Sequence, residues 1–287
     1  MVKSVMNKDY PKISVVTPNY NQDRFLEQTI KSVLDQGYPN LEYIVIDGKS
    51  TDNSVAIIKK YESQLHYWIS EKDNGMYDAI NKGFLKATGS IMCWINSDDL
   101  LAEKSLFKVA EVFNNNPNVN WLMGYPTIIN EQNEVTWQGQ DAKVFNPLFF
   151  YLHNHARDFS FIQQESTFWR RSIWEQAGGR LNTSYSLAAD FDLWLRFFRN
   201  HKLYFYKEQL SAFRKRKGQQ SENQDIYISE ANKSVKDNEK RLFLKDKLNI
   251  FLLKSIRKVL FMTKIKSLRN TFYKFQNRYF GKPTIIN

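Results

Sequence analysis

Residues 90–100 read SIMCWINSDDL and place a bulky apolar segment directly before two acidic residues. The segment 90–96 predicts a strand that is buried on both faces, as strands inside a parallel sheet are. Asp98 and Asp99 follow at the carboxyl end of that strand, where open α/β folds place their ligands. Carboxylates at such an edge can hold a divalent cation, which can hold a diphosphate. The structural alternative is that both aspartates cap the next helix.

Three earlier segments predict further strands of the same sheet. Residues 13–18, 41–46 and 66–70 are short β-branched or aromatic runs, with apolar residues at helical spacing between them. This alternation predicts βαβ units, whose right-handed connections bring the carboxyl ends of all strands to one edge. Four polar strand ends on one edge favour a ligand site over ordinary loop composition. The polar or turn-forming residues at these ends include Thr17, Pro18, Asn19, Asp47, Lys49, Asn96 and Ser97.

Composition and charge bound the class of protein. The 287 residues suffice for a large α/β domain with an appendage, and a single cysteine, Cys93, suits a reducing compartment. The first residues do not resemble a signal peptide, and no uncharged stretch has the length of a membrane span, so we expect a cytoplasmic protein. The net charge of +11 is concentrated after residue 239, where 13 Lys or Arg accompany one acid. The preceding part is therefore about neutral, which argues against a nucleic-acid partner.

The second half of the chain predicts more helices and strands and one further candidate residue. We expect a helix from about 101 to 113 and strands over 119–129, 163–171 and 203–206. In the predicted helix 187–200, Asp190 precedes a long apolar run. Its carboxylate can act as a general base or as the helix N-cap, with Asp192 then on the solvent side. The expected fold class is α/β, with a Rossmann-like and mostly parallel central sheet.

Six motifs occur in this order: VVTPNYNQ, IVIDGKSTDNS, ISEKDNGMYDAINKGFLKATG, WINSDD, QESTFWRRSIWEQAGG and AADFDLWLRFF. Together they resemble the family 2 glycosyltransferases, which have the nucleotide-sugar-binding GT-A fold. They cover about residues 11–221, and the pattern is similar to that of bacterial enzymes that build surface polysaccharides from lipid-linked intermediates. No GxGxxG or GxxxxGK[ST] occurs in the first half, which argues against a dinucleotide fingerprint or a P-loop.

The resemblance implies a role for each candidate at the strand ends. Residues 17–19 correspond to the loop that cradles the nucleoside, Asp47 to the acid that binds the base, and Asn81 to a position near the diphosphate. Asp98 corresponds to the last acid of the DxD motif that holds a divalent metal, Mn²⁺ or Mg²⁺. Asn96 stands where the first acid is expected, and an amide supplies an oxygen without charge. Asp99 can compensate as a second metal ligand.

The resemblance also implies the chemistry. Asp190 corresponds to the general base that removes a proton from the acceptor hydroxyl, so that in-line attack inverts the anomeric centre. Relatives often carry a histidine near Arg216, and this arginine could instead neutralise the charge of the diphosphate. No QxxRW motif is present, which favours transfer of a single sugar over polymerisation. The donor would be a nucleotide-diphosphate sugar and the acceptor a lipid-linked or glycan hydroxyl.

The basic tail carries a separate expectation. Residues 1–239 are expected to form the GT-A domain, with a nucleotide-binding half near 11–100 and an acceptor half near 101–221, and residues 240–287 a basic amphipathic helical appendage. An anionic membrane surface is the expected partner of residues 246–280, which suggests a peripheral protein on the inner face of the cytoplasmic membrane. Packing on the catalytic domain or a second subunit is the alternative. The predicted helix face consists of Phe261, Ile265, Leu268, Phe272, Phe275 and Tyr279.

Two rival functions remain open at this stage. A nucleotidyltransferase also joins a Rossmann-like half to carboxylates and a metal, but it should have a glycine-rich phosphate loop after the first strand, and TPNYNQ contains no glycine. A non-catalytic, membrane-associated scaffold with a relic fold would keep the motifs without activity. Donor binding separates the scaffold from an enzyme.

Overall fold

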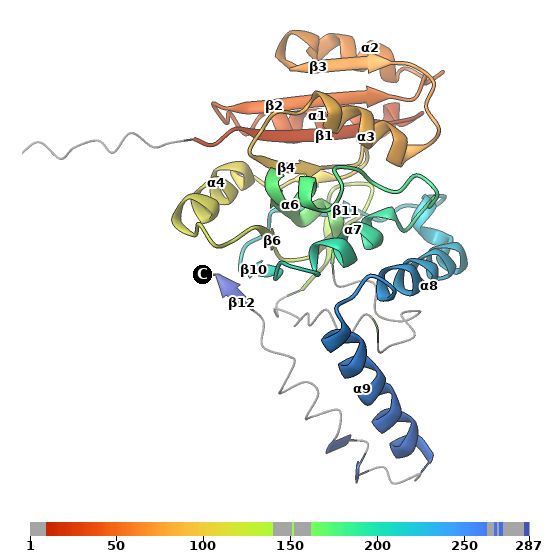
Figure 1. Cartoon of the computed structure of the whole chain (residues 1–287). Helices are drawn as coiled ribbons and strands as arrows, with labels where there is room; N and C mark the ends of the chain where they lie inside the picture. Colours follow the sequence, from red (N-terminus) through yellow and green to blue (C-terminus); the bar gives the residue numbers. More distant parts are fainter. Residues whose placement is uncertain are drawn as a thin grey trace, which may run out of the picture.

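The computed structural model describes residues 10–139, 151, 162–262, 267–268, 270–271 and 284–286. These residues form a central sheet in the order β12-β10-β6-β9-β4-β1-β2-β3, shown in Figure 1. All neighbouring strands are parallel except where β9 pairs with β4 and β6. The strands are β1 Ile13–Asn19, β2 Leu41–Asp47, β3 Tyr67–Ser70, β4 Ile91–Trp94, β6 Trp121–Met123, β9 Thr167–Arg170, β10 Tyr204–Tyr206 and β12 Thr284–Ile286.

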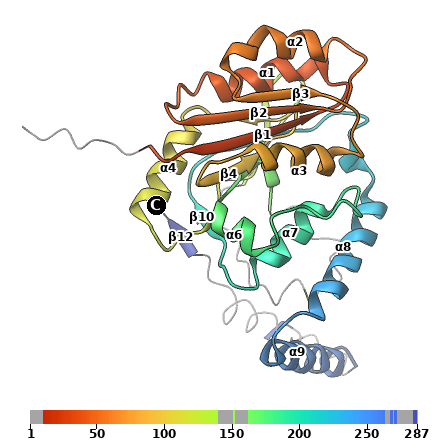
Figure 2. The same cartoon turned by 45° about the horizontal axis from the view of Figure 1, so that its top comes forward.

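The first four strands confirm the predicted βαβ half. Helices α1 (Asp23–Leu34) and α2 (Ser54–Tyr61) lie on one face of the sheet, and α3 (Met76–Lys86) lies on the other (Figure 2). Close packing of α3 depends on Gly83, because a Cβ atom there would lie 2.5 Å from Cγ1 of Val16. All residues of β1 and β4 are buried, as expected for strands between two helical layers.

A second, smaller sheet corrects two expectations for residues 100–129. Its order is β5-β11-β7-β8. The predicted strand 119–129 divides into β6 and β7, which belong to different sheets. Pro126 between them lacks an N–H for a strand hydrogen bond. Gly124 lies so close to the Glu208 carbonyl that a Cβ atom there would collide with it. The predicted helix from 101 begins later, as α4 (Ser105–Asn115). The strands are β5 Leu100–Leu101, β7 Thr127–Ile129, β8 Val135–Gln138 and β11 Ser211–Arg214.

Two other predicted strands are shorter than expected. The segment 163–171 begins with a 3₁₀ turn, η4 (Gln164–Ser166), before β9. The Nε2 group of Gln164 donates a hydrogen bond to the carbonyl of Trp94, which ties this turn to the end of β4. Strand β4, which was predicted over residues 90–96, ends at Trp94, so both aspartates lie beyond its end. The turn η4 therefore lies beside the predicted ligand edge.

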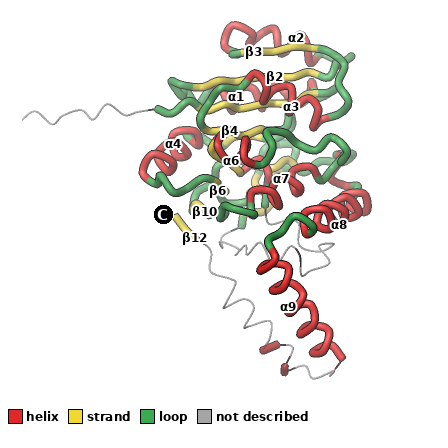
Figure 3. The backbone as a smooth tube through the Cα atoms, in the orientation of Figure 1, coloured by secondary structure: helices red, strands yellow, loops and turns green. Residues whose placement is uncertain are grey.

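Tryptophan packing fixes the second half against the sheet. Helices α6 (Arg171–Gln176) and α7 (Ala189–Phe197) follow β9 along the chain, and Figure 3 labels both helices below β4. The ring of Trp194 on α7 stacks on Trp94 of β4 at 5.9 Å and on Trp121 of β6 at 5.2 Å. These rings bury large apolar areas and hold α7 across the middle of the sheet. The first turn of α7 is thereby fixed near the carboxyl end of β4.

The tail combines helix and strand. Helix α8 (Gln224–Glu239) packs on α7, α9 (Leu244–Met262) projects from the body, and β12 pairs in parallel with β10 at the sheet edge. The tail is therefore helical over α9, while its last described residues belong to the central sheet. Most of the predicted face from Phe261 to Tyr279 lies outside the described residues. Across the part of the chain that the structure describes, no helix is long and apolar enough to cross a membrane.

Candidate functional site

The carboxyl ends of β1, β2 and β3 are joined by one buried carboxylate. Asp47 accepts hydrogen bonds from Asn19 Nδ2 at 2.7 Å and from Ser70 Oγ at 2.6 Å, and it also accepts from the backbone N–H and hydroxyl of Ser50. Its side chain is fully buried. Asp47 thus organises three strand ends, with both of its oxygens occupied by protein donors. Its expected contact with a base stays a prediction.

The other predicted donor residues differ in how open they are. Thr17, Pro18 and Asn19 are buried at the end of β1, where the Thr17 hydroxyl bonds to the Tyr43 hydroxyl at 3.1 Å. Asn19 Oδ1 is buried and has no hydrogen-bond partner among the described residues, so it is an acceptor available to a ligand. Lys49 is exposed and adopts a left-handed conformation with a φ of 65°.

The two aspartates after β4 have different environments. Asp99 is fully buried, and its carboxylate accepts hydrogen bonds from the Arg214 N–H at 2.8 Å and from Asn96 Nδ2 at 3.2 Å. Burial, reinforced by the charges of Asp98 and Glu165, raises the pKa of Asp99 well above its usual range. Helix α4 has Lys104 at its N-cap position. The helix-capping alternative for these aspartates is therefore wrong.

Asp98 instead faces a cation at the rim of the site. Its Oδ2 accepts a hydrogen bond from Arg216 Nε at 2.9 Å, and its side chain keeps 18% of its surface exposed. Arg216 also donates to Gln22 Oε1 at 3.0 Å and lies over the ring of Phe25. The chain just after β11 thus places Arg216 in the region where the resemblance leads one to expect a histidine. The Ser97 side chain beside this pair is buried.

The oxygen groups at this edge suit a hard divalent cation that also binds phosphate. Asn96 Oδ1 is buried without a hydrogen-bond partner among the described residues, and Asp98 offers a partly exposed carboxylate two residues later. Within the described ranges, no three His, Cys, Asp or Glu side chains form a group that could hold a metal ion. Mg²⁺ and Mn²⁺ sites commonly combine one or two protein carboxylates with substrate phosphates. The residues therefore fit a site that is completed by the donor.

Asp190 lies in the first turn of α7 and is not its N-cap. The N-cap position belongs to Ala188, so the capping alternative for Asp190 is wrong. Asp192 is also not on the solvent side, because it is buried and forms an ion pair with Arg196 at 2.9 Å. Burial, with a smaller contribution from the charge of Glu230, raises the pKa of Asp190 to about 7, although hydrogen bonds from the Phe191 N–H and from Tyr77 oppose the rise.

The carboxylate of Glu165 lies near both Asp98 and Asp190. Glu165 on η4 is 4% exposed, and its Oε1 is buried with no hydrogen-bond partner among the described residues. Burial, with the charges of Asp190 and Asp98, raises the pKa of Glu165 to about 8. The charges of Asp98 and Glu165 also both raise the pKa of Asp99. The carboxylates at the end of β4, on η4 and on α7 therefore share one region.

Asn81 serves the site indirectly. Its Nδ2 donates to the Leu181 carbonyl at 3.0 Å, and its Oδ1 accepts from the Leu181 N–H at 2.8 Å. Both ends of the amide are thereby used to fix the segment that leads from α6 into α7. The expected contact of Asn81 with a diphosphate stays a prediction, and its hydrogen bonds support the placement of α7.

Sequence reasoning missed the surroundings of Asp190. Tyr77 comes from α3, Tyr227 and Glu230 from α8, and the charge of Asp190 raises the pKa of both tyrosines in addition to their burial. Tyr77 belongs to the NGMYDAINKG motif, which gave one usable signal. Residues 222–239 carried no motif, and only the three-dimensional packing of α8 on α7 identifies Glu230.

Comparisons with known proteins show the family to which the chain belongs. The sequence profile of Glycosyl transferase family 2 matches residues 14–176. An uncharacterized glycosyltransferase of Mycobacterium tuberculosis is 30% identical over 193 residues, covering 65% of this chain and 68% of that protein. The putative teichuronic acid biosynthesis glycosyltransferase TuaG of Bacillus subtilis is 36% identical over 104 residues, covering 35% and 41%. The chain therefore belongs to glycosyl transferase family 2.

Solved structures confirm the fold. The crystal structure of Staphylococcus aureus TarS residues 1–349 in complex with UDP-GlcNAc matches with a TM-score of 0.66 at 17% identity, covering 85% of this chain and 70% of that one. The match to a longer TarS structure covers 71% of this chain and 37% of that chain, with a TM-score of 0.58. The predicted GT-A fold, with a mostly parallel central sheet and C-terminal helices, is thus confirmed.

Proposed function

We propose that this protein transfers one sugar, with inversion, from a nucleotide-diphosphate sugar to a hydroxyl of a lipid-linked or glycan acceptor in surface-polysaccharide synthesis. Family membership supports glycosyl transfer. The UDP-GlcNAc and UDP complexes of TarS support a nucleotide-sugar donor, and TuaG's description supports polysaccharide synthesis. The observation that carries the proposal is Asp190, a carboxylate with a pKa near 7 beside the strand edge.

Asp190 supplies the base. A carboxyl group with a pKa near the working pH is ionised in a large fraction of molecules and still has enough basicity to accept a proton. It would take the proton of the acceptor hydroxyl as that oxygen attacks the anomeric carbon. The bond from that carbon to the donor diphosphate breaks on the opposite face, which inverts the anomeric centre.

Asp98, Asn96 and Arg216 would receive the leaving diphosphate. A bound Mn²⁺ or Mg²⁺ would neutralise the charge that develops on the departing phosphate. Asp98 and the unpartnered oxygen of Asn96 would hold that ion, with Asp99 as a more buried second candidate. The guanidinium of Arg216 already lies on Asp98 and can turn its remaining donors to phosphate oxygens.

The metal role is tested by the substitution Asp98→Ala. Calorimetry of UDP binding should show that Mn²⁺ strengthens binding to the wild-type chain, and that this gain falls by at least about tenfold in the variant, the scale of one charge-assisted interaction. Glu103→Ala is the matched control, because that acid lies beyond the same strand with a side chain that is 87% exposed. Equal UDP affinities of the wild-type chain with and without Mn²⁺ would contradict a role of the metal in donor binding.

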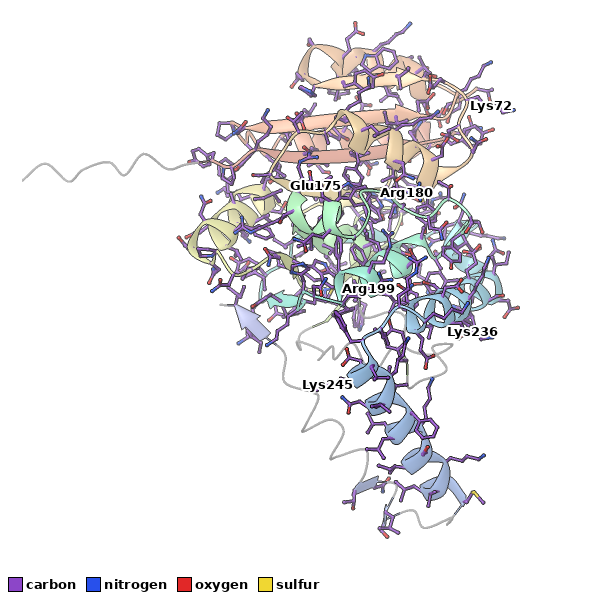
Figure 4. The ribbon with its side chains drawn as sticks, viewed as in Figure 1. Lys72, Glu175, Arg180, Arg199, Lys236 and Lys245 are labelled. Atoms are coloured by element: carbon purple, nitrogen blue, oxygen red, sulfur yellow. The ribbon has the colours of Figure 1, made fainter. Side chains whose placement is uncertain are left out.

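We also propose that the tail attaches the protein to the inner face of the cytoplasmic membrane. One side of α9 contributes Ile250 and Leu253 to the core, and its other side is apolar and exposed. The exposed lysines on this helix include Lys245, labelled near the start of α9 in Figure 4. Apolar residues with cations and one acid, Asp246, match an anionic lipid surface. The α9 apolar face consists of Leu244, Leu248, Phe251, Leu252, Val259 and Met262.

A further inference from the structure

Helix α8 lies beyond the part of the chain that the family profile matches, yet it packs directly on the helix that carries Asp190. The profile ends at residue 176, and α8 follows more than forty residues later. Figures 1 and 2 show α8 alongside α7 from both directions, and the two helices pack against one another. The residues of α8 that face α7 are therefore in a position to influence the first turn of α7.

Glu230 uses its whole carboxylate on the segment that enters α7. One oxygen accepts from the Ser186 N–H and hydroxyl, each at 2.8 Å. The other oxygen accepts from the Leu187 N–H at 2.8 Å and from the Ala188 N–H at 3.0 Å. Burial alone would raise the pKa of Glu230, but these four hydrogen bonds hold it below its usual range. Glu230 is therefore a partly exposed anion whose carboxylate is surrounded by three consecutive residues.

This contact stabilises the approach to a helix that has no side-chain cap. The first N–H groups of any helix lack partners within the helix, and a side-chain oxygen at the N-cap usually accepts from them. The N-cap of α7 is Ala188, which has no such oxygen and forms no side-chain cap. A carboxylate from a different helix satisfies the entering backbone instead, and it also lies at the end of α7 where the helix dipole favours negative charge.

Asp190 lies two residues after the last N–H that Glu230 accepts. The path of the backbone through residues 186–188 determines where the first turn of α7, and so the Asp190 carboxylate, points. The groups that face Asp190 are Tyr77 from α3, Tyr227 and Glu230 from α8, and Glu165 from η4. Among them, Glu230 has a charge that acts on Asp190 and also holds the backbone that carries it.

We propose that Glu230 is a positioning residue for the general base: it fixes the entry into α7 so that Asp190 is aimed at the acceptor. The negative charge of Glu230 also contributes to the raised pKa of Asp190. The inference rests on the proposed function, because it gives Asp190 a proton to accept. It adds a determinant of catalysis that lies outside the matched family region. Loss of Glu230 should thus affect turnover and its pH dependence, and leave donor binding unchanged.

The fold has a second anchor that allows Glu230 to be tested. Asp192 accepts hydrogen bonds from Ser234 Oγ at 2.9 Å and Asn238 Nδ2 at 3.1 Å, one and two turns after Glu230. Arg199, which follows the end of α7 and is labelled in Figure 4, also donates a hydrogen bond to Asn238. These contacts keep α8 on α7 when the charge of Glu230 is removed.

The experiment compares the substitution Glu230→Gln with Asp237→Asn in the full-length protein. Asp237 is the control, because it is an exposed acid of the same helix that pairs with Lys240. With a donor that supports wild-type turnover, Glu230→Gln should lower kcat about tenfold or more, change donor Kd by less than about twofold, and move the midpoint of the kcat–pH profile to lower pH. Asp237→Asn should leave all three values unchanged.

A third variant separates position from charge. Glu230→Asp keeps the negative charge but shortens the side chain by one methylene group, so kcat should fall while the midpoint moves less than in Glu230→Gln. Wild-type kcat and midpoint in a folded Glu230→Gln protein would overturn the positioning role while leaving the proposed transferase intact. Absence of turnover with every donor in the wild-type chain would overturn the proposed function itself, and the role of Glu230 with it.

Discussion

The chemistry expected of Asp190 is created by its burial and by residues from two other elements, α3 and α8. An exposed aspartate is almost fully ionised at neutral pH and is a weak base. Here burial, with the charge of Glu230, raises the pKa of Asp190 to about 7, while Tyr77 limits the rise by donating a hydrogen bond. A base of this strength suits deprotonation of a sugar hydroxyl. The residue is thus defined by its surroundings more than by its own position in the sequence.

The raised pKa predicts how turnover depends on pH. Asp190 must be ionised to accept a proton, so kcat should rise with pH and level off above about 7. The measurement is kcat at saturating donor and acceptor between pH 5 and 9. Glu165→Gln is the control, because Glu165 is another nearby carboxyl with a raised pKa, and the rise of kcat with pH should persist in that variant. A profile that is flat in the wild type, or that becomes flat in Glu165→Gln, would contradict the assignment to Asp190.

The sequence identified the candidate residues better than it identified their contacts. Asp98 and Asp190 were found because each adjoins an apolar run that predicts an element. Their partners, Arg216 and Glu230, come from positions 118 and 40 residues away, and no periodicity links them. Asp47 was expected to face a ligand, yet its carboxylate accepts four hydrogen bonds from protein groups. These groups lie on β1, on the turn after β2 and on β3. Contacts between distant segments depend on packing, which local patterns do not contain.

At the scale of elements, α7 is held by its apolar face and by the hydrogen bonds that α8 donates to one buried carboxylate of α7. Asp192 pairs with Arg196, and α8 completes the hydrogen bonding of its carboxylate. We predict that Asp192→Ala lowers the free energy of unfolding by about 3–5 kcal/mol, since it leaves a buried arginine without its partner. Urea denaturation measures this. Asp225→Ala, an exposed acid in the first turn of α8, should cost far less, and equal losses would contradict the role of Asp192.

Elements with regular patterns were predicted, and those defined by pairing were not. The strands β1 to β4 and the helices between them followed from hydrophobic periodicity, because each is buried in a repeated way. The stretch 119–129 was expected as one strand, since its apolar residues continue through Gly124 and Pro126. Its division between two sheets depends on the partners β10 and β11, which lie about eighty residues later. Strand β12 was missed for the same reason.

At the scale of the whole molecule, the tail both completes the fold and offers a surface. Removing residues after 239 would delete β12 and the buried side chains of Ile250 and Leu253, so truncation would confuse attachment with folding. Substitution of exposed residues is the cleaner test. We predict that Phe251→Ser combined with Leu252→Ser reduces sedimentation with phosphatidylglycerol vesicles by more than about tenfold, since each side chain adds about 2 kcal/mol when buried.

The control for this test is Leu85→Ser, because Leu85 is 82% exposed but lies on α3. Sedimentation should remain at the wild-type level in that variant, and it should be weak with phosphatidylcholine alone. Unchanged sedimentation of the double variant would contradict attachment through the α9 apolar face. A different outcome is that the wild-type chain does not bind vesicles but dimerises as its concentration rises. If the double variant then no longer dimerises, the α9 apolar face binds a second copy of the chain.

The most direct test of the central claim is the turnover of Asp190→Asn at saturating donor and acceptor. Asparagine keeps the size of the side chain but cannot accept the proton, so kcat should fall by roughly 100-fold or more while donor affinity stays near the wild-type value. Asp192→Asn is not a suitable control, because Asp192 is buried, so the exposed Asp237→Asn serves that purpose. Near-wild-type turnover in a folded Asp190→Asn protein would contradict the account.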